Sequence, residues 1–130
     1  MESIFSKIVA GQIPAHKVAE TLEYLAFLDI NPLTEGHLLV IPKKEVDYLF
    51  DLDSETYLGL MMFAKIVAAG LKRAIPCERI GLTVIGLEVP HAHIHLIPMN
   101  TMDDMNFSRP KLKLSEERLT EIAEAIRVQL

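Results

Sequence analysis

Hydrophobic positions along the chain alternate between short apolar runs and longer stretches with helical spacing. The short runs are bounded by Gly, Pro or charged turns, which is typical of β-strands. They predict five strands, at residues 17–20, 24–28, 37–41, 79–85 and 91–97. Because only a charged turn separates the first two runs, these two strands are expected to form a hairpin.

Three other segments have the hydrophobic spacing of helices. Residues 3–9 predict one short helical turn. Residues 53–73 contain no Pro and predict the main packing helix, with Asp53 or Ser54 as its N-cap. Ser115 precedes a last helix, whose apolar stripe consists of Leu119, Ile122, Ala123 and Ile126. Together the elements predict an α+β fold, in which a five-stranded, mostly antiparallel sheet carries a main helix and a C-terminal helix.

The length of the chain limits it to one hydrophobic core. Half of its 130 residues are apolar, and no repeat or linker divides them, so we expect a single domain over residues 1–130. The polar connection at residues 99–114 is too long for an ordinary turn and directly follows the last strand. It is expected to be either a flap over a site or a disordered segment.

Charge and cysteine content narrow the classes of partner. The net charge of -5 argues against bulk attraction to nucleic acid or to an anionic membrane, while a nucleotide remains a possible ligand. Cys77 is the only cysteine, which excludes an intrachain disulfide and favours a reducing compartment, the cytoplasm. The chain shows neither the pattern of a signal peptide nor an apolar run of the ~18 residues that a membrane span needs.

Candidate chemistry is concentrated in the run Pro-His-Ala-His-Ile-His-Leu-Ile-Pro at residues 90–98. On a strand, side chains alternate between faces, so His91, His93 and His95 are expected on one face and the apolar residues between them on the other. Packing alone rarely requires three adjacent imidazoles. The array therefore indicates a metal site, a nucleophile with its proton relay, or a pH-sensitive patch without chemistry.

The metal and nucleophile hypotheses make different demands on the array. Two or three of these His can converge on zinc or iron, and His37 or Glu88 is available as a further ligand, but neither stands in a recognisable ligand spacing. No metal ligand set is therefore predicted. A nucleophile needs one imidazole with a free nitrogen, its other nitrogen held by a hydrogen bond, and further His nearby to carry protons. The array can supply each of these parts.

This run and two further blocks of the sequence resemble one known family. The run from His91 to Ile97 is similar to the histidine-triad motif, in which three His alternate with apolar residues and two apolar residues follow. The other matching blocks are residues 3–8 with 12–15, and residues 25–32 with 36–43, so the resemblance covers about residues 3–98 in order. It implies nucleotidyl hydrolases or transferases, most similar to the Hint-like nucleoside phosphoramidases. It further implies a five-stranded sheet with helices, a purine nucleotide substrate, no cofactor and a homodimer.

The resemblance also implies roles for the histidines. His93 is expected to attack the α-phosphorus of a nucleotide derivative and to form a covalent nucleotidyl-histidine, which water then hydrolyses to the monophosphate. His91 and His95 are expected to donate hydrogen bonds to the phosphoryl oxygens. His37 is expected to complete a proton relay to the leaving group, although a His bonded at a strand end would give the same sequence.

Substrate-binding residues follow from the same resemblance. Asp29 matches the acidic residue that accepts hydrogen bonds from the ribose hydroxyls, and it can also cap the turn that follows it. Phe5, Ile8, Phe27 and Ile30 match the lining of the base pocket. From composition alone these four apolar residues fit an ordinary core equally well.

The chain departs from the family pattern in two places. Some relatives bind zinc through a Cys-x-x-Cys pair at positions that are Ser3 and Ser6 here, and hydroxyls are poor zinc ligands. The phosphate-binding loop before the triad is shortened to residues 86–90, and Glu88 replaces a hydroxyl residue. A carboxylate repels phosphate unless it turns away or is protonated; Glu88 can instead accept a hydrogen bond from an amine leaving group or brace the loop.

Three functional classes follow from the sequence. The leading prediction is a nucleotide phosphoramidase or related nucleotidyl hydrolase. The altered loop favours, as a second class, a nucleotide-binding protein with little catalysis. The third is a metal-dependent hydrolase or binding protein that uses the His triad as ligands.

Overall fold

Five strands form one sheet in the computed structural model, which describes residues 2–130. The strands are β1 (Lys17–Glu20), β2 (Tyr24–Leu28), β3 (Leu38–Pro42), β4 (Arg79–Thr83) and β5 (Ile94–Met99). Their order in the sheet is β1-β2-β3-β5-β4, and each neighbouring pair is antiparallel. The helices are α1 (Ile4–Val9), α2 (Ser54–Ala74) and α3 (Glu116–Arg127), with two short 3-10 turns, Leu49–Asp51 and Met102–Met105. The predicted α+β architecture is confirmed.

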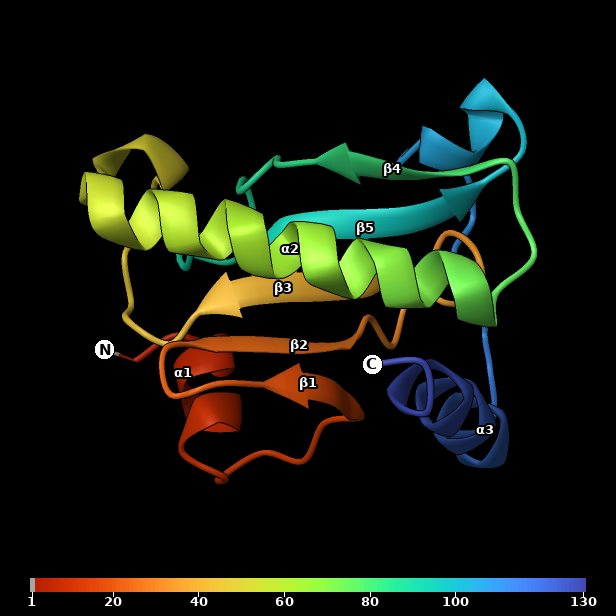
Figure 1. The fold of residues 1–130 in the computed structure, drawn as a ribbon, viewed down its shortest axis with the longest axis horizontal. Helices are drawn as coiled ribbons and strands as arrows, with labels where there is room; N and C mark the ends of the chain where they lie inside the picture. The colour runs from red at the N-terminus through yellow and green to blue at the C-terminus, as the bar shows by residue number, and fades with distance from the viewer. Residues whose placement is uncertain (1) are drawn as a thin grey trace.

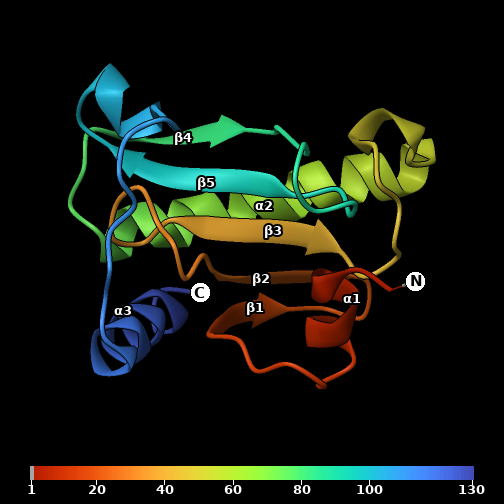
Figure 2. The ribbon, with the colours of Figure 1, turned by 180° about the vertical axis from the view of Figure 1, so that it is seen from behind.

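Helices cover both faces of the sheet (Figures 1 and 2). The long helix α2 crosses one face, where α3 packs beside it against β1 and β2. The short helix α1 lies on the opposite face. The central strand β2 alternates between the two cores: Ala26 and Leu28 pack with α2 and α3, while Leu25 and Phe27 pack with α1. This double burial explains why β2 is a continuous apolar run.

The helix caps follow the sequence closely. Asp53 is the N-cap of α2 and accepts a hydrogen bond from the Thr56 amide, and Ser115 does the same for α3 through Arg118. The apolar residues predicted on α3 are all buried. In the part of the chain that the structure describes, no helix is long and apolar enough to cross a membrane.

Strands β3, β4 and β5 differ in their boundaries from the prediction, and the largest difference is at the start of β5. Strand β5 begins at Ile94 rather than at residue 91, because the preceding residues bond to loops instead of to β3. The amide of His91 donates to the Val89 carbonyl at 2.8 Å, and the amide of Ala92 donates to the Val46 carbonyl at 2.7 Å. The first and second histidines of the triad therefore lie in the loop that enters β5. Smaller differences are that β3 starts and ends one residue later than expected and that β4 ends at Thr83.

The connection after β5 is ordered against the sheet. Its Leu112 amide donates to the Pro32 carbonyl at 2.8 Å, and Arg109 donates to the Leu33 carbonyl at 2.8 Å. Arg109 also forms ion pairs with Asp103 and Asp104. Residues 99–114 were expected to be either a flap over a site or a disordered segment, and these contacts support the flap.

Candidate active site

A cavity of about 470 Å³ opens on the α1 face of the sheet. One part of it is apolar, lined by Phe5, Ile8, Ile13, Phe27, Ile30 and Leu39. The other part is polar, lined by Asp29, Glu88, His93, His95 and Lys111. The residues expected at the site therefore line one cavity, although they come from distant parts of the sequence. The two exceptions are His37 and His91, which do not line it.

His93 presents one free nitrogen to this cavity. Its Nδ1 lies 2.7 Å from the carbonyl oxygen of His91. Because a carbonyl only accepts, Nδ1 carries the ring proton, and the lone pair of the neutral ring is on Nε2. The edge-on contact with Phe5, at a centroid distance of 5.0 Å, fixes the ring plane. His93 therefore lines the cavity as a neutral ring with an unprotonated Nε2.

A chain of hydrogen bonds runs from the backbone through His37 to His95. The Leu33 amide donates to His37 Nδ1 at 3.0 Å, so His37 carries its proton on Nε2. His37 Nε2 lies 2.9 Å from His95 Nδ1 and donates to it. Because His95 Nδ1 accepts this bond, the single ring proton of neutral His95 is on Nε2. As His95 lines the cavity, this proton is available to a bound ligand.

Burial keeps this pair uncharged. The side chain of His37 is 1% exposed, and burial lowers its pKa from the ordinary value of 6.5 to about 3. Burial likewise lowers the pKa of His95 to about 4. Both rings are therefore neutral near pH 7, which is the state that the hydrogen-bond chain requires.

The only group of possible metal ligands found among the described residues does not fit a metal. Asp29, His37 and His95 each offer a ligand atom within 4.8 Å of the others. A ligating imidazole must supply a lone pair. His37 faces the group with Nε2, 3.6 Å from Asp29 Oδ2, and this nitrogen carries the proton because Nδ1 accepts from the Leu33 amide. The donor set thus argues against the metal-dependent class.

His91 differs from its expected role. Its ring is fully buried and does not line the cavity. Nε2 lies 2.8 Å from the Pro42 carbonyl, and Nδ1 lies 2.8 Å from the Ser3 hydroxyl. With both nitrogens bonded, the ring has no atom left for a phosphoryl oxygen. Donation from His91 to a phosphoryl oxygen stays a prediction, and it would require His91 to give up its bond to the Pro42 carbonyl.

Asp29 lies between the two parts of the cavity. Its Oδ1 accepts a hydrogen bond from the Asn31 amide at 2.8 Å, which is the turn cap that the sequence indicated. Its Oδ2 lies 3.6 Å from His37 Nε2, beyond hydrogen-bond distance, and burial raises the pKa of the carboxyl. The neighbouring Ile30 lines the cavity although 61% of it is exposed, which is unusual for a core residue and fits a wall that awaits a ligand.

The shortened loop before the triad forms the rim of the cavity. Gly86 adopts a φ of +71°, a left-handed conformation that favours glycine. Glu88 is exposed and lines the cavity. Among residues 2–130, no hydrogen bond or ion pair to the Glu88 carboxylate is found, so nothing there supports the expectation that it braces the loop.

Sequence reasoning missed two residues of the wall, Phe107 and Lys111. Phe107 lies edge-on to His95 at a centroid distance of 4.9 Å and to His37 at 6.1 Å. Lys111 lies over the Phe107 ring and donates to its backbone carbonyl at 2.6 Å. The length and position of the segment were the only signals in the sequence, because a loop has no periodicity that would point to single side chains.

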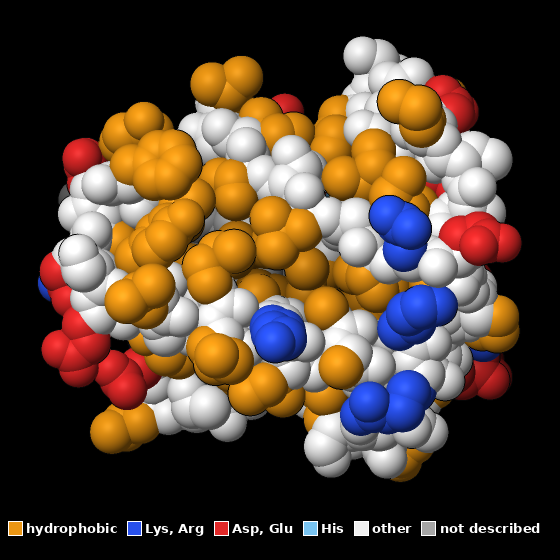
Figure 3. Space-filling view, turned by 45° about the horizontal axis from the view of Figure 1, so that its top comes forward, with side chains coloured by type: hydrophobic (Ala, Val, Ile, Leu, Met, Phe, Trp, Pro, Cys, Tyr) orange, Lys and Arg blue, Asp and Glu red, His pale blue; other side chains and the backbone are white. Residues whose placement is uncertain are grey.

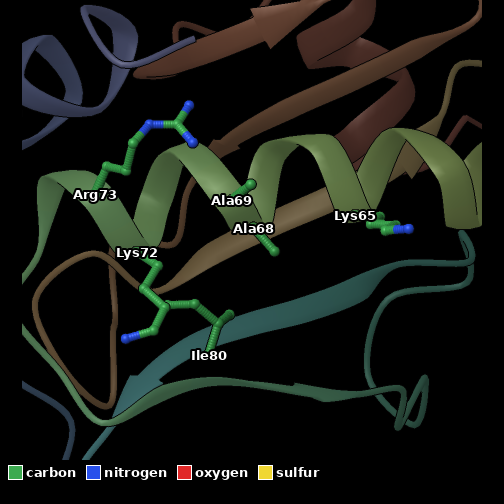
Figure 4. Close-up of a pocket in the computed structure, with 6 residues that line it drawn as sticks. All are labelled: Lys65, Ala68, Ala69, Lys72, Arg73 and Ile80. Atoms are coloured by element: carbon green, nitrogen blue, oxygen red, sulfur yellow. The ribbon is translucent and has the colours of Figure 1, made fainter.

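A second hollow lies between α2 and β4 on the other face (Figure 4). It is lined by Lys65, Lys72, Arg73, Ile80 and two alanines. Lys72 donates to the Cys77 carbonyl and Arg73 to the Gln129 carbonyl. No His or carboxylate lines this hollow, so the His-containing cavity is the better candidate for chemistry.

The sequence is similar to a known family of proteins. The HIT domain model matches residues 10–102. An uncharacterized HIT-like protein of Borreliella burgdorferi is 36% identical over 99% of each chain. An adenosine 5'-monophosphoramidase of Schizosaccharomyces pombe is 35% identical over 97% of this chain and 96% of its own.

Solved structures extend the match to the fold. The crystal structure of a Hit-like protein of Bartonella henselae superposes with a TM-score of 0.86, at 31% identity over 99% of this chain and 97% of that one. The domain match, these similarities and the arrangement of the three histidines lead to one conclusion: the chain belongs to the histidine-triad (HIT) family.

Proposed function

We propose that the protein is a nucleotide hydrolase that acts at the α-phosphate of purine nucleotide derivatives through a covalent nucleotidyl-histidine. The observation that carries this proposal is the state of His93, whose Nε2 is open to the cavity while Nδ1 is bonded to the His91 carbonyl. The named activity of the Schizosaccharomyces pombe relative supports the same class of substrate.

The two parts of the cavity suit the two ends of a nucleotide. The apolar part accepts the base, and the open oxygen of Asp29 accepts a hydrogen bond from a ribose hydroxyl. The α-phosphate then lies against His93 and His95. The oxygens of this phosphate accept hydrogen bonds from groups that line the cavity. His91 is not one of these groups, because both of its ring nitrogens are already bonded.

In the first step, His93 Nε2 forms a bond to the α-phosphorus while the bond from phosphorus to the leaving group breaks. The proton on His95 Nε2 passes to the leaving group, and the negative charge that this leaves on the His37–His95 pair is offset by the positive charge that the new bond to phosphorus puts on the His93 ring. In the second step, water attacks the phosphorus and gives a proton to His95 Nε2, which restores the neutral pair; the bond to His93 breaks, and the nucleoside monophosphate leaves.

Charge at the rim of the cavity favours an amine leaving group over a polyphosphate. Asp29 and Glu88 carry carboxylates, whereas Lys111 is the single cation in the lining. A polyphosphate would bring further negative charge to this rim, and an amine would not. Nucleoside phosphoramidates are therefore proposed as better substrates than dinucleoside polyphosphates.

Release of AMP tests the proposal. We expect chelator-resistant turnover of adenosine 5'-phosphoramidate and slower turnover of a diadenosine polyphosphate, both measured by chromatography. Turnover that a chelator removes and a metal restores would contradict the proposal in favour of a metal-dependent hydrolase. AMP binding without turnover of either substrate would instead support the nucleotide-binding class, which the unpaired Glu88 favours.

We further propose that the protein forms a homodimer through the face formed by α2 and β4, called here the α2–β4 face. Beside the cations Lys65, Lys72 and Arg73, this face carries a group of exposed hydrophobic side chains (Figure 3). They are Tyr48, Phe50, Leu58, Met62, Ile66, Leu82 and Ile85. Leu58, Met62 and Ile66 are spaced four residues apart and form one stripe on α2, and β4 is an edge strand with unpaired backbone groups. A monomer rarely exposes so extended an apolar face.

The substitution Ile66→Glu is expected to convert the dimer to a monomer, because it places a charge in the centre of the α2–β4 face. Light scattering coupled to size exclusion measures the mass. Leu22→Glu is the matched control, since Leu22 is an exposed hydrophobic residue in the turn between β1 and β2, at the opposite edge of the sheet. A dimer that survives Ile66→Glu, or a monomeric wild type, would refute this interface.

A further inference from the structure

A buried hydroxyl near the amino terminus contacts the triad. Ser3 is 4% exposed, and its Oγ lies 2.8 Å from His91 Nδ1, although the two residues are 88 positions apart. Ser3 does not line the cavity, so it has no contact with substrate. We propose that Ser3, anchored by Glu45, is a positioning residue that holds His93 in its reactive tautomer. This inference rests on the proposed function for its kinetic consequence.

Each hydrogen atom in this contact has one possible place. His91 Nε2 faces the Pro42 carbonyl, which only accepts, so His91 carries its proton on Nε2 and has its lone pair on Nδ1. The Ser3 hydroxyl must then donate to Nδ1. The Ser3 oxygen in turn accepts from the Ser6 amide at 2.9 Å, which makes Ser3 the N-cap of α1. One side chain thus both starts a helix and fixes the His91 ring.

Glu45 holds Ser3 from the solvent side. Its Oε1 accepts from the Ser3 amide and from the Ser6 hydroxyl, both at 2.6 Å. The hydrogen bonds from these serines lower the pKa of Glu45 to about 2, so the carboxylate is charged at neutral pH and is a strong acceptor. Glu45, Ser3, Ser6 and His91 thus form one hydrogen-bonded cluster. It runs from the exposed carboxylate of Glu45 to the fully buried imidazole of His91.

The cluster reaches the nucleophile through one peptide group. His91 is fixed by its ring on two sides, and its backbone carbonyl is the sole acceptor for His93 Nδ1. If the His91 ring loses its Ser3 partner, the side chain no longer restrains this loop residue, and its backbone carbonyl can shift away from His93. His93 can then place its proton on Nε2, and in that tautomer the nitrogen that faces the cavity has no lone pair for attack.

The substitution Ser3→Ala tests this inference, because it leaves His91 Nδ1 buried without a donor. We expect kcat for AMP release from adenosine 5'-phosphoramidate to fall roughly ten-fold, which corresponds to one hydrogen bond, while KM changes little. In ¹⁵N spectra of the imidazoles, the fraction of neutral His93 with its proton on Nδ1 should fall as well. Glu45→Ala, at an exposed position that tolerates substitution, should shift both quantities in the same direction and less.

Ser115→Ala is the matched control. Ser115 is also a serine N-cap, whose side chain accepts from the Arg118 amide, but it contacts no histidine. It should lose similar stability and keep the kcat and the His93 spectrum of the wild type. Equal kcat in Ser3→Ala, Glu45→Ala and Ser115→Ala, with an unchanged His93 spectrum, would overturn the inference. If the protein turned over no substrate, the spectrum alone would decide it, so the two proposals can fail separately.

Discussion

Replacing His93 by Ala is expected to reduce the release of AMP from adenosine 5'-phosphoramidate by at least about 10⁴-fold. The proposed reaction passes through a bond to His93 Nε2, and the other imidazoles cannot take its place. His91 has both nitrogens bonded, and His95 presents a protonated nitrogen. Loss of the nucleophile therefore removes the covalent pathway and leaves only direct attack by water.

The covalent intermediate gives this prediction a second readout. Wild-type protein mixed with excess substrate and quenched in base should carry the mass of one nucleotidyl group, whereas His93→Ala should carry none. Base is required because a phosphorus bond to histidine hydrolyses in acid. Circular dichroism and AMP binding serve as controls for folding. A variant that still binds AMP and still turns over would show that His93 is not the nucleophile.

Predictable features of the fold are those that a local pattern determines. Strands β1 and β2 have the predicted bounds, since a charged turn and Asp29 limit them on the sequence itself. The start of β5 was misplaced because alternation of apolar and polar residues continues through residues 91–93. The Ala92 side chain packs in the core as a strand residue would, yet its amide bonds to Val46 in a loop. Alternation with a period of two indicates which face of the sheet a side chain occupies. It does not indicate which group the backbone amide or carbonyl bonds to.

The site divides in a similar way. The spacing of the motifs was sufficient to predict that His93, His95 and Asp29 share one cavity. The contacts of His91 were not predicted because its partners, Ser3 and Pro42, are 88 and 49 positions away, and the sequence contains no local sign of such contacts. Phe107 and Lys111 were missed for the same reason: the loop that carries them is placed by hydrogen bonds to residues 32 and 33.

Replacing His95 by Ala is expected to slow the two kinds of nucleotide substrate unequally. For adenosine 5'-phosphoramidate, the leaving nitrogen must be protonated as its bond to phosphorus breaks, and the proton on His95 Nε2 is placed to do this. Loss of this acid should lower kcat about 10²- to 10⁴-fold. A p-nitrophenyl ester of AMP releases a stable anion that needs no proton, so its turnover should fall much less.

The ratio of these two losses separates acid catalysis from simple binding of phosphate. His16→Ala is the matched control, because His16 lies outside the cavity, where its ring bonds to Glu116, and it should leave both rates unchanged. If His95 only held the phosphoryl oxygens, both substrates would lose rate equally, since both carry the same α-phosphate. Equal losses would therefore contradict a proton relay through His37 and His95. A loss confined to the phosphoramidate would identify the buried, neutral pair as the source of the leaving-group proton.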